Sequence, residues 1–212
     1  LRARFNPELN KSWFGAVMEV INNVTMLSII LTGAALLRER EHGTVEHLLV
    51  MPVTPLEIMA GKVWAMALVV LIATACSLFF VVQGLLKVPI EGSIALFLAG
   101  TALHLFATTS LGIFLGTLAR SMPQFGLLIM LVLLPLQMLS GGSTPRESMP
   151  ELVQFVMLSA PNTHFVMLAQ AILYRGAGIR VVWPQFIAIA GIGTILFSLA
   201  LARFRRTITT MV

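Results

Sequence analysis

Five long stretches of this chain contain no Asp, Glu, Lys or Arg, and each could cross a lipid bilayer. They lie between Glu19 and Arg38, Lys62 and Lys87, Glu91 and Arg120, Arg120 and Arg146, and Arg180 and Arg203. A helix needs about 20 apolar residues to span the hydrocarbon core, and its backbone must satisfy its own hydrogen bonds there. The sequence therefore predicts an all-α, polytopic transmembrane helical bundle, with spans near residues 15–37, 62–85, 93–118, 122–140 and 182–202.

The composition predicts the same class of protein. Hydrophobic residues make up 58% of the chain and charged residues only 11%, whereas a soluble domain has about 25% charged residues. The net charge of +5 does not indicate nucleic acid, because the basic residues are scattered at the ends of the predicted spans without interleaved aromatics. Lipid headgroups account for them, so we expect a lipid bilayer and no nucleic-acid partner.

A sixth uncharged run, residues 152–174, is interrupted near its middle by Pro161. It could be a sixth crossing. However, a proline removes a backbone donor and disfavours helix at the preceding residue, while Ser148 with Glu151, and Asn162 after the proline, supply new helix starts. We therefore predict two short helices in a re-entrant hairpin, residues 145–176, which we name the outer hairpin.

The charged segment 38–61 separates the first two predicted spans and contains two signals for helix starts. Thr54, Pro55 and Glu57 form a capping-box pattern, with the proline at the first helical position. Thr44 can cap a second, shorter helix that ends at Met51-Pro52 and carries Val45, Leu48 and Leu49 on one face. Such an amphipathic helix suits a membrane surface or the groove of a partner protein.

Two groups of residues resemble a known family. The first runs in the order Glu41, Gly43-Thr44, Leu48-Leu49, Pro52, Glu57-Ile58 and Gly61-Lys62, and the second comprises Ser140-Gly141, residues 145–150 and residues 161–164. Both resemble, in the right order, the cytoplasmic and outer loops of ABC-2 type transporter permeases, the membrane subunits of ATP-driven exporters. The resemblance covers essentially the whole chain. The chain differs from the family pattern at its start, because the family begins with a first span and an external domain that are not seen here. We expect residues 1–14 to be the end of that external segment.

The resemblance implies a function and partners. The chain would be an exporter permease that works as a homodimer or heterodimer with a separate ATPase subunit, which binds ATP and Mg, while this chain binds no cofactor or metal. In the family, segment 38–61 is the coupling loop that docks on the ATPase; the residues implied are Glu41, Gly43, Thr44, Glu46 and Leu48. Pro145, Pro161 and Asn162 would shape the outer hairpin. A bacterial inner (plasma) membrane is the implied location.

Sequence signals for catalysis are weak. The chain contains no Asp, and Gly61-Lys62 lacks the preceding GxxxxG of a phosphate loop, so we expect no ATPase site of its own. His42 and His47 are five residues apart without an accompanying Cys or Asp, which does not favour a metal site. The alternatives are a non-ABC secondary transporter or channel, for which no midplane charges or inverted repeats are visible, and an intramembrane enzyme, for which no HExxH or GxSxG pattern occurs.

Polar residues inside the predicted spans are further candidates. Asn22 and Asn23 lie within one turn of Glu19 and are candidates to line a path, while Glu19 could equally lie at the outer interface. His104 lies beside Thr101, Thr108 and Thr109, where hydrogen bonding between helices is favoured over a contact with substrate or protons. Thr108, Gly112 and Gly116 form a ridge of small residues that suits close helix packing within the chain or in a dimer.

The ends of the last predicted span suggest its orientation. Arg203, Arg205 and Arg206 follow it closely, and basic residues are enriched on the cytoplasmic side of membrane proteins. We therefore expect a cytoplasmic C-terminus, and with five spans the coupling loop and the turn at Arg120 lie on that same side.

Overall fold

The structure is a computed structural model that describes residues 11–42, 53–88, 90–142 and 148–209. Within these ranges the regular elements are all helical, which confirms the predicted all-α class. In chain order they are α2 (Lys11–Glu41), α4 (Pro55–Cys76), its π-helical continuation η1 (Ser77–Leu85), α5 (Ile94–Leu118), α6 (Met122–Leu139), α7 (Glu151–Met157), α8 (Pro161–Arg175) and α9 (Ile179–Thr209).

Five helices are long and apolar enough to cross a membrane: Gly15–Glu41, Pro55–Leu85, Ile94–Leu118, Met122–Leu139 and Ile179–Arg206. They correspond to the five predicted spans. Helix α2 continues to Glu41 and α4 already begins at Pro55, so the helices extend further into segment 38–61 than the predicted spans did. At the start of α4, the Thr54 N–H donates to Glu57 Oε2 over 2.7 Å and the Glu57 N–H donates to Thr54 Oγ1 over 3.3 Å. This confirms the predicted capping box.

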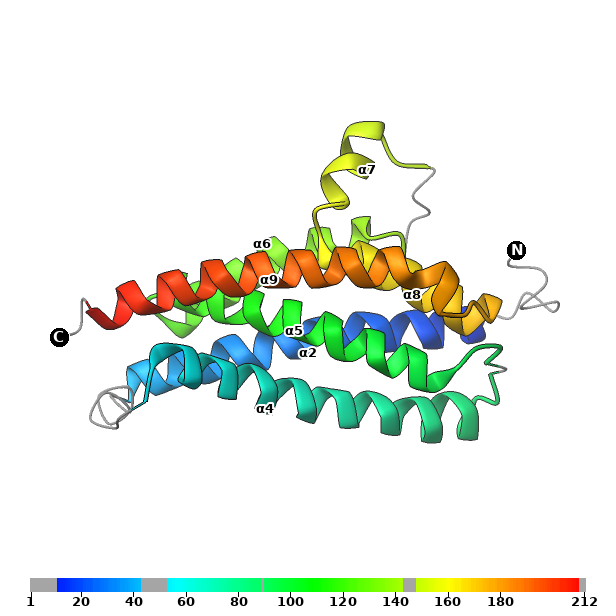
Figure 1. Cartoon of the computed structure of the whole chain (residues 1–212), viewed down its shortest axis with the longest axis horizontal. Coiled ribbons are helices and arrows are strands. Elements are labelled where there is room, and N and C mark those ends of the chain that lie inside the picture. Colours follow the sequence, from blue (N-terminus) through cyan, green and yellow to red (C-terminus); the bar gives the residue numbers. More distant parts are fainter. Residues whose placement is uncertain (1–10, 43–52, 89, 143–147, 210–212) are drawn as a thin grey trace.

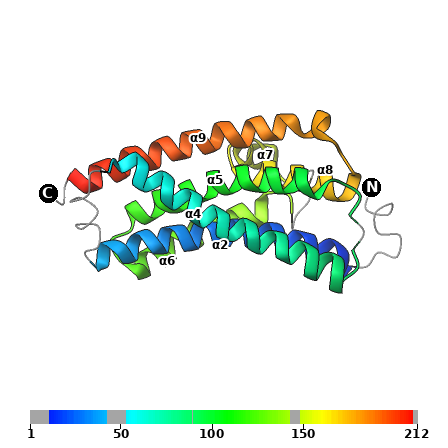
Figure 2. The ribbon, with the colours of Figure 1, turned by 60° about the horizontal axis from the view of Figure 1, so that its bottom comes forward.

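Helix α5 occupies the centre of the bundle and packs against α2, α4, α8 and α9 (Figures 1 and 2). Helix α6 packs on α2 and leaves much of its own surface exposed. The end of α2, the start of α4 and the end of α9 lie at one end of the bundle, while α8 lies toward the other end (Figure 1). The ridge of Thr108, Gly112 and Gly116 faces α2, so it serves packing within the chain.

The α7–α8 pair is broken where the sequence predicted it. The two helices are bent by 91°, and Pro161 occupies the first helical position of α8. Two details of the prediction were wrong. Helix α7 begins after Pro150 without a side-chain cap, so Ser148 does not cap it. Asn162 lies inside α8 rather than at its cap, because Ala160 takes that position and frees the amide side chain for contacts with other helices.

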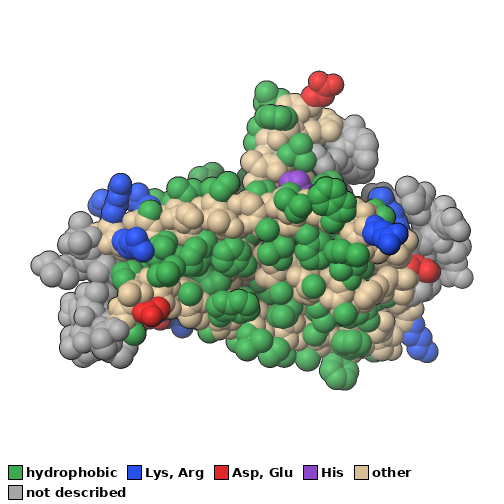
Figure 3. All heavy atoms as spheres, in the orientation of Figure 1, with side chains coloured by type: hydrophobic (Ala, Val, Ile, Leu, Met, Phe, Trp, Pro, Cys, Tyr) green, Lys and Arg blue, Asp and Glu red, His purple; other side chains and the backbone are tan. Residues whose placement is uncertain are grey.

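The surface separates charge from apolar area. In Figure 3, Lys, Arg, Asp and Glu side chains gather near the two ends of the bundle and on the projecting α7, with hydrophobic and uncharged side chains between them. Large apolar side chains stay exposed along this belt, among them Leu68, Ile72, Leu131, Ile187 and Ile195. Exposing such an apolar belt to water would be unfavourable, whereas in a membrane the lipid tails cover it. The chain is a multi-pass membrane protein.

Candidate functional sites

A chain of hydrogen bonds joins four helices in the interior. His104 of α5 lies with its Nε2 2.9 Å from Thr25 Oγ1 of α2. Thr25 Oγ1 lies 2.8 Å from Asn162 Oδ1 of α8, and Asn162 Nδ2 lies 2.8 Å from the Leu136 carbonyl oxygen of α6. The side chains of Thr25, His104 and Asn162 are fully buried. We name these three residues with the Leu136 carbonyl the polar chain.

The direction of every proton in the polar chain follows from Leu136. A carbonyl only accepts, so the Asn162 amide nitrogen must face it and the amide oxygen must face Thr25. The Thr25 hydroxyl then donates to Asn162 Oδ1 at 2.8 Å, the nearer of its two acceptors, since the Ile21 carbonyl lies 3.2 Å away. His104 in turn donates from Nε2 to Thr25. The imidazole therefore carries a proton on Nε2. Its Nδ1 is buried and has no hydrogen-bond partner among the described residues.

An aromatic stack holds the imidazole in place. The rings of His104 and Phe165 lie parallel, with an interplanar angle of 7° and centroids 4.0 Å apart, and Phe97 stacks on Phe165 in turn. All three side chains are fully buried. The prediction of interhelical hydrogen bonding for His104 is confirmed, and the structure identifies Thr25 of α2 as its partner.

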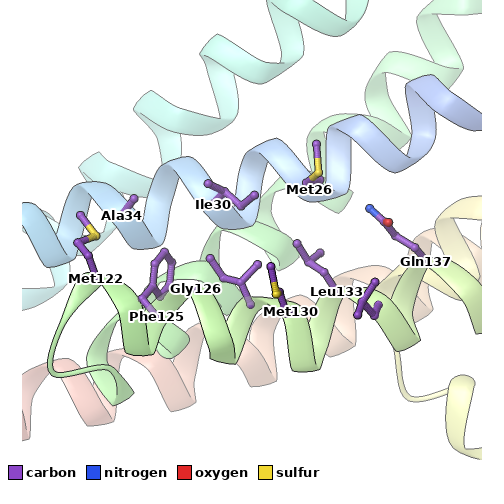
Figure 4. Close-up of a pocket in the computed structure, with 11 residues that line it drawn as sticks. Met26, Ile30, Ala34, Met122, Phe125, Gly126, Met130, Leu133 and Gln137 are labelled. Atoms are coloured by element: carbon purple, nitrogen blue, oxygen red, sulfur yellow. The ribbon is translucent and has the colours of Figure 1, made fainter.

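An apolar groove of about 440 Å³ lies between α2 and α6. Figure 4 shows Met26, Ile30 and Ala34 of α2 along one wall, with α6 residues from Met122 to Gln137 along the other. Gln137 contributes the single polar side chain of this lining. Such volumes are typical of small-molecule sites, so the groove can accept an apolar, uncharged molecule.

The last turn of α2 is attached to three other helices. Glu39 forms an ion pair with Lys62 of α4. Arg40 Nη1 donates to the carbonyls of Gly116 and Ala119 at the end of α5, over 3.3 and 3.2 Å. Glu41 Oε1 accepts from the Met122 N–H, 3.3 Å away at the start of α6. These carbonyls and this N–H are the groups that helix ends leave without intrahelical partners. We name Glu39, Arg40 and Glu41 the α2 end cluster.

The sequence-predicted residues fall into separate places. Glu41 belongs to the α2 end cluster, while Gly43, Thr44, Glu46, Leu48 and Pro145 lie outside the described residues. Asn162 joins the polar chain beside the break at Pro161. Asn22 and Asn23 are half-buried; the Asn23 amide donates to Glu19 Oε1 one turn earlier over 3.2 Å. The structure thus unites His104 with Asn162 but not with the two asparagines of α2.

Several residues of these sites were missed in the sequence. Thr25 and Ser28 continue the polar face of the first span, and their spacing could have indicated it: Thr25, Ser28 and Thr32 recur at i, i+3 and i+7. The groove between α2 and α6 had no sequence signal, since methionine, isoleucine and leucine occur throughout the spans. Arg40 belongs to the charged segment 38–61, and nothing in the sequence indicated a contact with another helix. In the structure it binds the end of α5.

Comparison with known proteins agrees with this architecture. Residues 6–174 match the family model of the ABC-2 type transporter. The chain is 69% identical over 210 residues to a protein of Escherichia coli strain K12 named inner membrane transport permease YhhJ, covering 99% of this chain and 56% of that protein. It is 29% identical over 209 residues to the probable multidrug ABC transporter permease YbhR of the same organism, covering 98% of this chain and 56% of the relative. The chain spans about half the length of these curated relatives.

The chain belongs to the ABC-2 type transporter family. This family is distinct from the secondary transporters, channels and intramembrane enzymes that the sequence left open.

Proposed function

We propose that this chain is the permease part of an ABC exporter in a bacterial inner membrane, paired with a second permease subunit and driven by a separate ATPase that binds ATP and Mg. In this proposal the C-terminus and the coupling loop face the cytoplasm. ATP binding moves the coupling loop and thereby tilts the spans, so that a cargo route opens outward. Such a shift requires the nucleotide-bound ATPase to bind one arrangement of the loop better than the other.

The observation that carries the proposal is the α2 end cluster. It immediately precedes the segment from Gly43 to Leu48 that is expected to dock on the ATPase. Because Glu39, Arg40 and Glu41 contact α4, α5 and α6, a displacement of the end of α2 acts on three other spans together. Rigid helices joined in this way are what a mechanical coupling requires.

The α2–α6 groove supports the cargo part of the proposal. It is lined by the same two helices, α2 and α6, that the cluster joins through Glu41 and Met122. A movement at the end of α2 is therefore transmitted to both walls of the groove. We expect the cargo to be apolar and uncharged, since the lining offers it no charged partner.

A charge reversal tests the coupling. Glu46→Lys in the full-length protein should lower retention of the ATPase in pull-downs or uncouple ATP hydrolysis from export, with normal membrane insertion. Glu151→Lys makes the same change on exposed α7, away from the coupling loop, and serves as the control. Wild-type values for Glu46→Lys in both assays would remove the coupling loop from the mechanism.

A further inference from the structure

The polar chain closes the neck of the α7–α8 excursion. The chain leaves the bundle at the end of α6, forms α7, and returns at the start of α8. Asn162 and Leu136 are 26 residues apart, and their hydrogen bond joins the two sides of this excursion. Figure 1 shows α7 projecting away from the bundle beyond this neck. The base of α7 is attached as well, since Met157 is buried in the cluster that contains Leu133 and Leu136 of α6.

The carbonyl of Leu136 is an available partner because of where α6 ends. It belongs to the last turn of the helix, whose carbonyls have no intrahelical donor. Asn162 satisfies it only while α8 stays in place. If the first turn of α8 moves away, a buried carbonyl and a buried amide both lose their partners, which in hydrocarbon costs more than in water.

The remaining bonds make this contact depend on α2 and α5. The Thr25 hydroxyl bonds Asn162 of α8 and His104 of α5 at the same time, so this one side chain of α2 connects the two other helices. A rotation of α2 against α5 would separate Thr25 from His104 and weaken the hydrogen bond between Thr25 and Asn162. Hydrogen bonds connected in series polarise one another, so the polar chain should form and break as a unit.

We propose that the polar chain is a latch that holds the start of α8, and with it the base of α7, against the bundle, and that it must break for α7 to swing away. The latch itself follows from the contacts above; only its opening by ATP rests on the proposed export function. His104, Thr25 and Asn162 are then positioning residues, which bind no cargo themselves.

The test measures how fast a buried cysteine at the neck reacts. Met157→Cys, introduced into the full-length protein with Cys76→Ser, places a thiol at a position that is 7% exposed; we name it the neck reporter. Asn162→Leu and Thr25→Val keep the volume but each removes two hydrogen bonds of the polar chain. Each should raise the rate of modification by a water-soluble maleimide by at least about tenfold. Thr25→Ser retains the hydroxyl and should stay near the wild-type rate.

Two controls separate the latch from general loosening. Ser28→Ala removes a buried bond of 2.7 Å between Ser28 and Thr108, which joins α2 and α5 without touching α8, and it should leave the neck reporter slow. A second thiol, Val63→Cys, lies at a position that is 3% exposed within a different apolar cluster; we name it the core reporter, and it should not respond to any variant. Unchanged rates at the neck reporter in Asn162→Leu and Thr25→Val, or equal increases at both reporters, would overturn the latch.

Adding the nucleotide-bound ATPase then tests the opening separately. A faster reaction of the neck reporter on nucleotide binding, without any change at the core reporter, supports opening of the latch by the ATPase. A rate that responds to the latch variants but not to nucleotide contradicts ATP-driven opening and leaves the latch itself supported.

Discussion

Gly112 of α5 lies directly against the backbone of Ile29 in α2. A Cβ added at Gly112 would be 2.6 Å from the Ile29 carbonyl oxygen, too close for any real contact. The same contact line continues one turn later, where a Cβ at Gly116 would be 3.0 Å from the Gly33 carbonyl. Because the obstacles are backbone atoms, a side chain at Gly112 would force the two helices apart.

Gly112→Ala should therefore destabilise the protein, by about 1–3 kcal/mol, the usual cost of overpacking. The measurement is thermal unfolding of the detergent-solubilised full-length protein. Gly126→Ala is the matched control, since nothing lies within 4 Å of a Cβ there and alanine is the better helix former by up to about 1 kcal/mol. Equal melting temperatures for the two variants would contradict the close approach of α2 and α5.

Filling the α2–α6 groove should block the cargo without affecting the fold. The side chain of Gly126→Phe enters open space in the groove and should lower transport of an apolar test compound by roughly tenfold, equivalent to about 1.4 kcal/mol of lost binding. Gly191→Phe makes the same substitution at an open position on exposed α9 and should transport normally. If both variants transport alike in reconstituted vesicles, the groove is not on the cargo route.

Exchanging the charges of Glu39 and Lys62 should show how their ion pair supports the α2 end. The two side chains are 32% and 18% exposed, so the pair contributes about 0.5–1 kcal/mol. Glu39→Lys alone places like charges together and should lower the melting temperature, and the double variant Glu39→Lys/Lys62→Glu should recover most of it. Failure of the double variant to recover would show that the ion pair is not the source of the effect.

Gly176 ends α8 in the left-handed region, with φ of 64°, and a Cβ there would also lie 3.1 Å from the Glu91 carbonyl oxygen. Gly176→Ala should cost about 1–2 kcal/mol, the penalty of a left-handed conformation for an L-residue. Gly178→Ala, two residues later, meets nothing within 4 Å and should be neutral. Denaturation curves of the two variants should differ by that amount; coincident curves would argue against the left-handed cap.

The topology can be tested by labelling single cysteines in intact cells. Met149, a natural choice on the hairpin, is only 8% exposed, so exposed Glu151 is the better position. In a Cys76→Ser background, Glu151→Cys should react with a membrane-impermeant maleimide from outside. Arg120→Cys, in the exposed turn between α5 and α6, should react only after the cells are opened. Labelling of both from one side would mean that α6, the one long helix described between these two positions, does not cross the membrane, which would contradict the five-span topology.

Local physical chemistry explains what could be read directly from the residues. The charge-free runs predict the five spans because hydrocarbon excludes charge and requires helices. Thr54 and Glu57 predict the start of α4 because their two hydrogen bonds involve residues three apart. Pro161 predicts the break between α7 and α8 because its ring removes a backbone donor. The capping box and the proline act within about one helical turn, and each charge-free run corresponds to a single span.

The partners of the polar residues could not be read in this way. Ser148 and Asn162 both suit helix starts, yet the bonds of Asn162 reach Thr25 and Leu136, which are 137 and 26 residues away. In a membrane helix nearly every face is apolar, so periodicity does not reveal which face meets which neighbour. The sequence by itself determined the class, the spans and the helix breaks. The tertiary structure decided the polar chain, the α2 end cluster and the α2–α6 groove, because these depend on contacts between helices far apart in the chain.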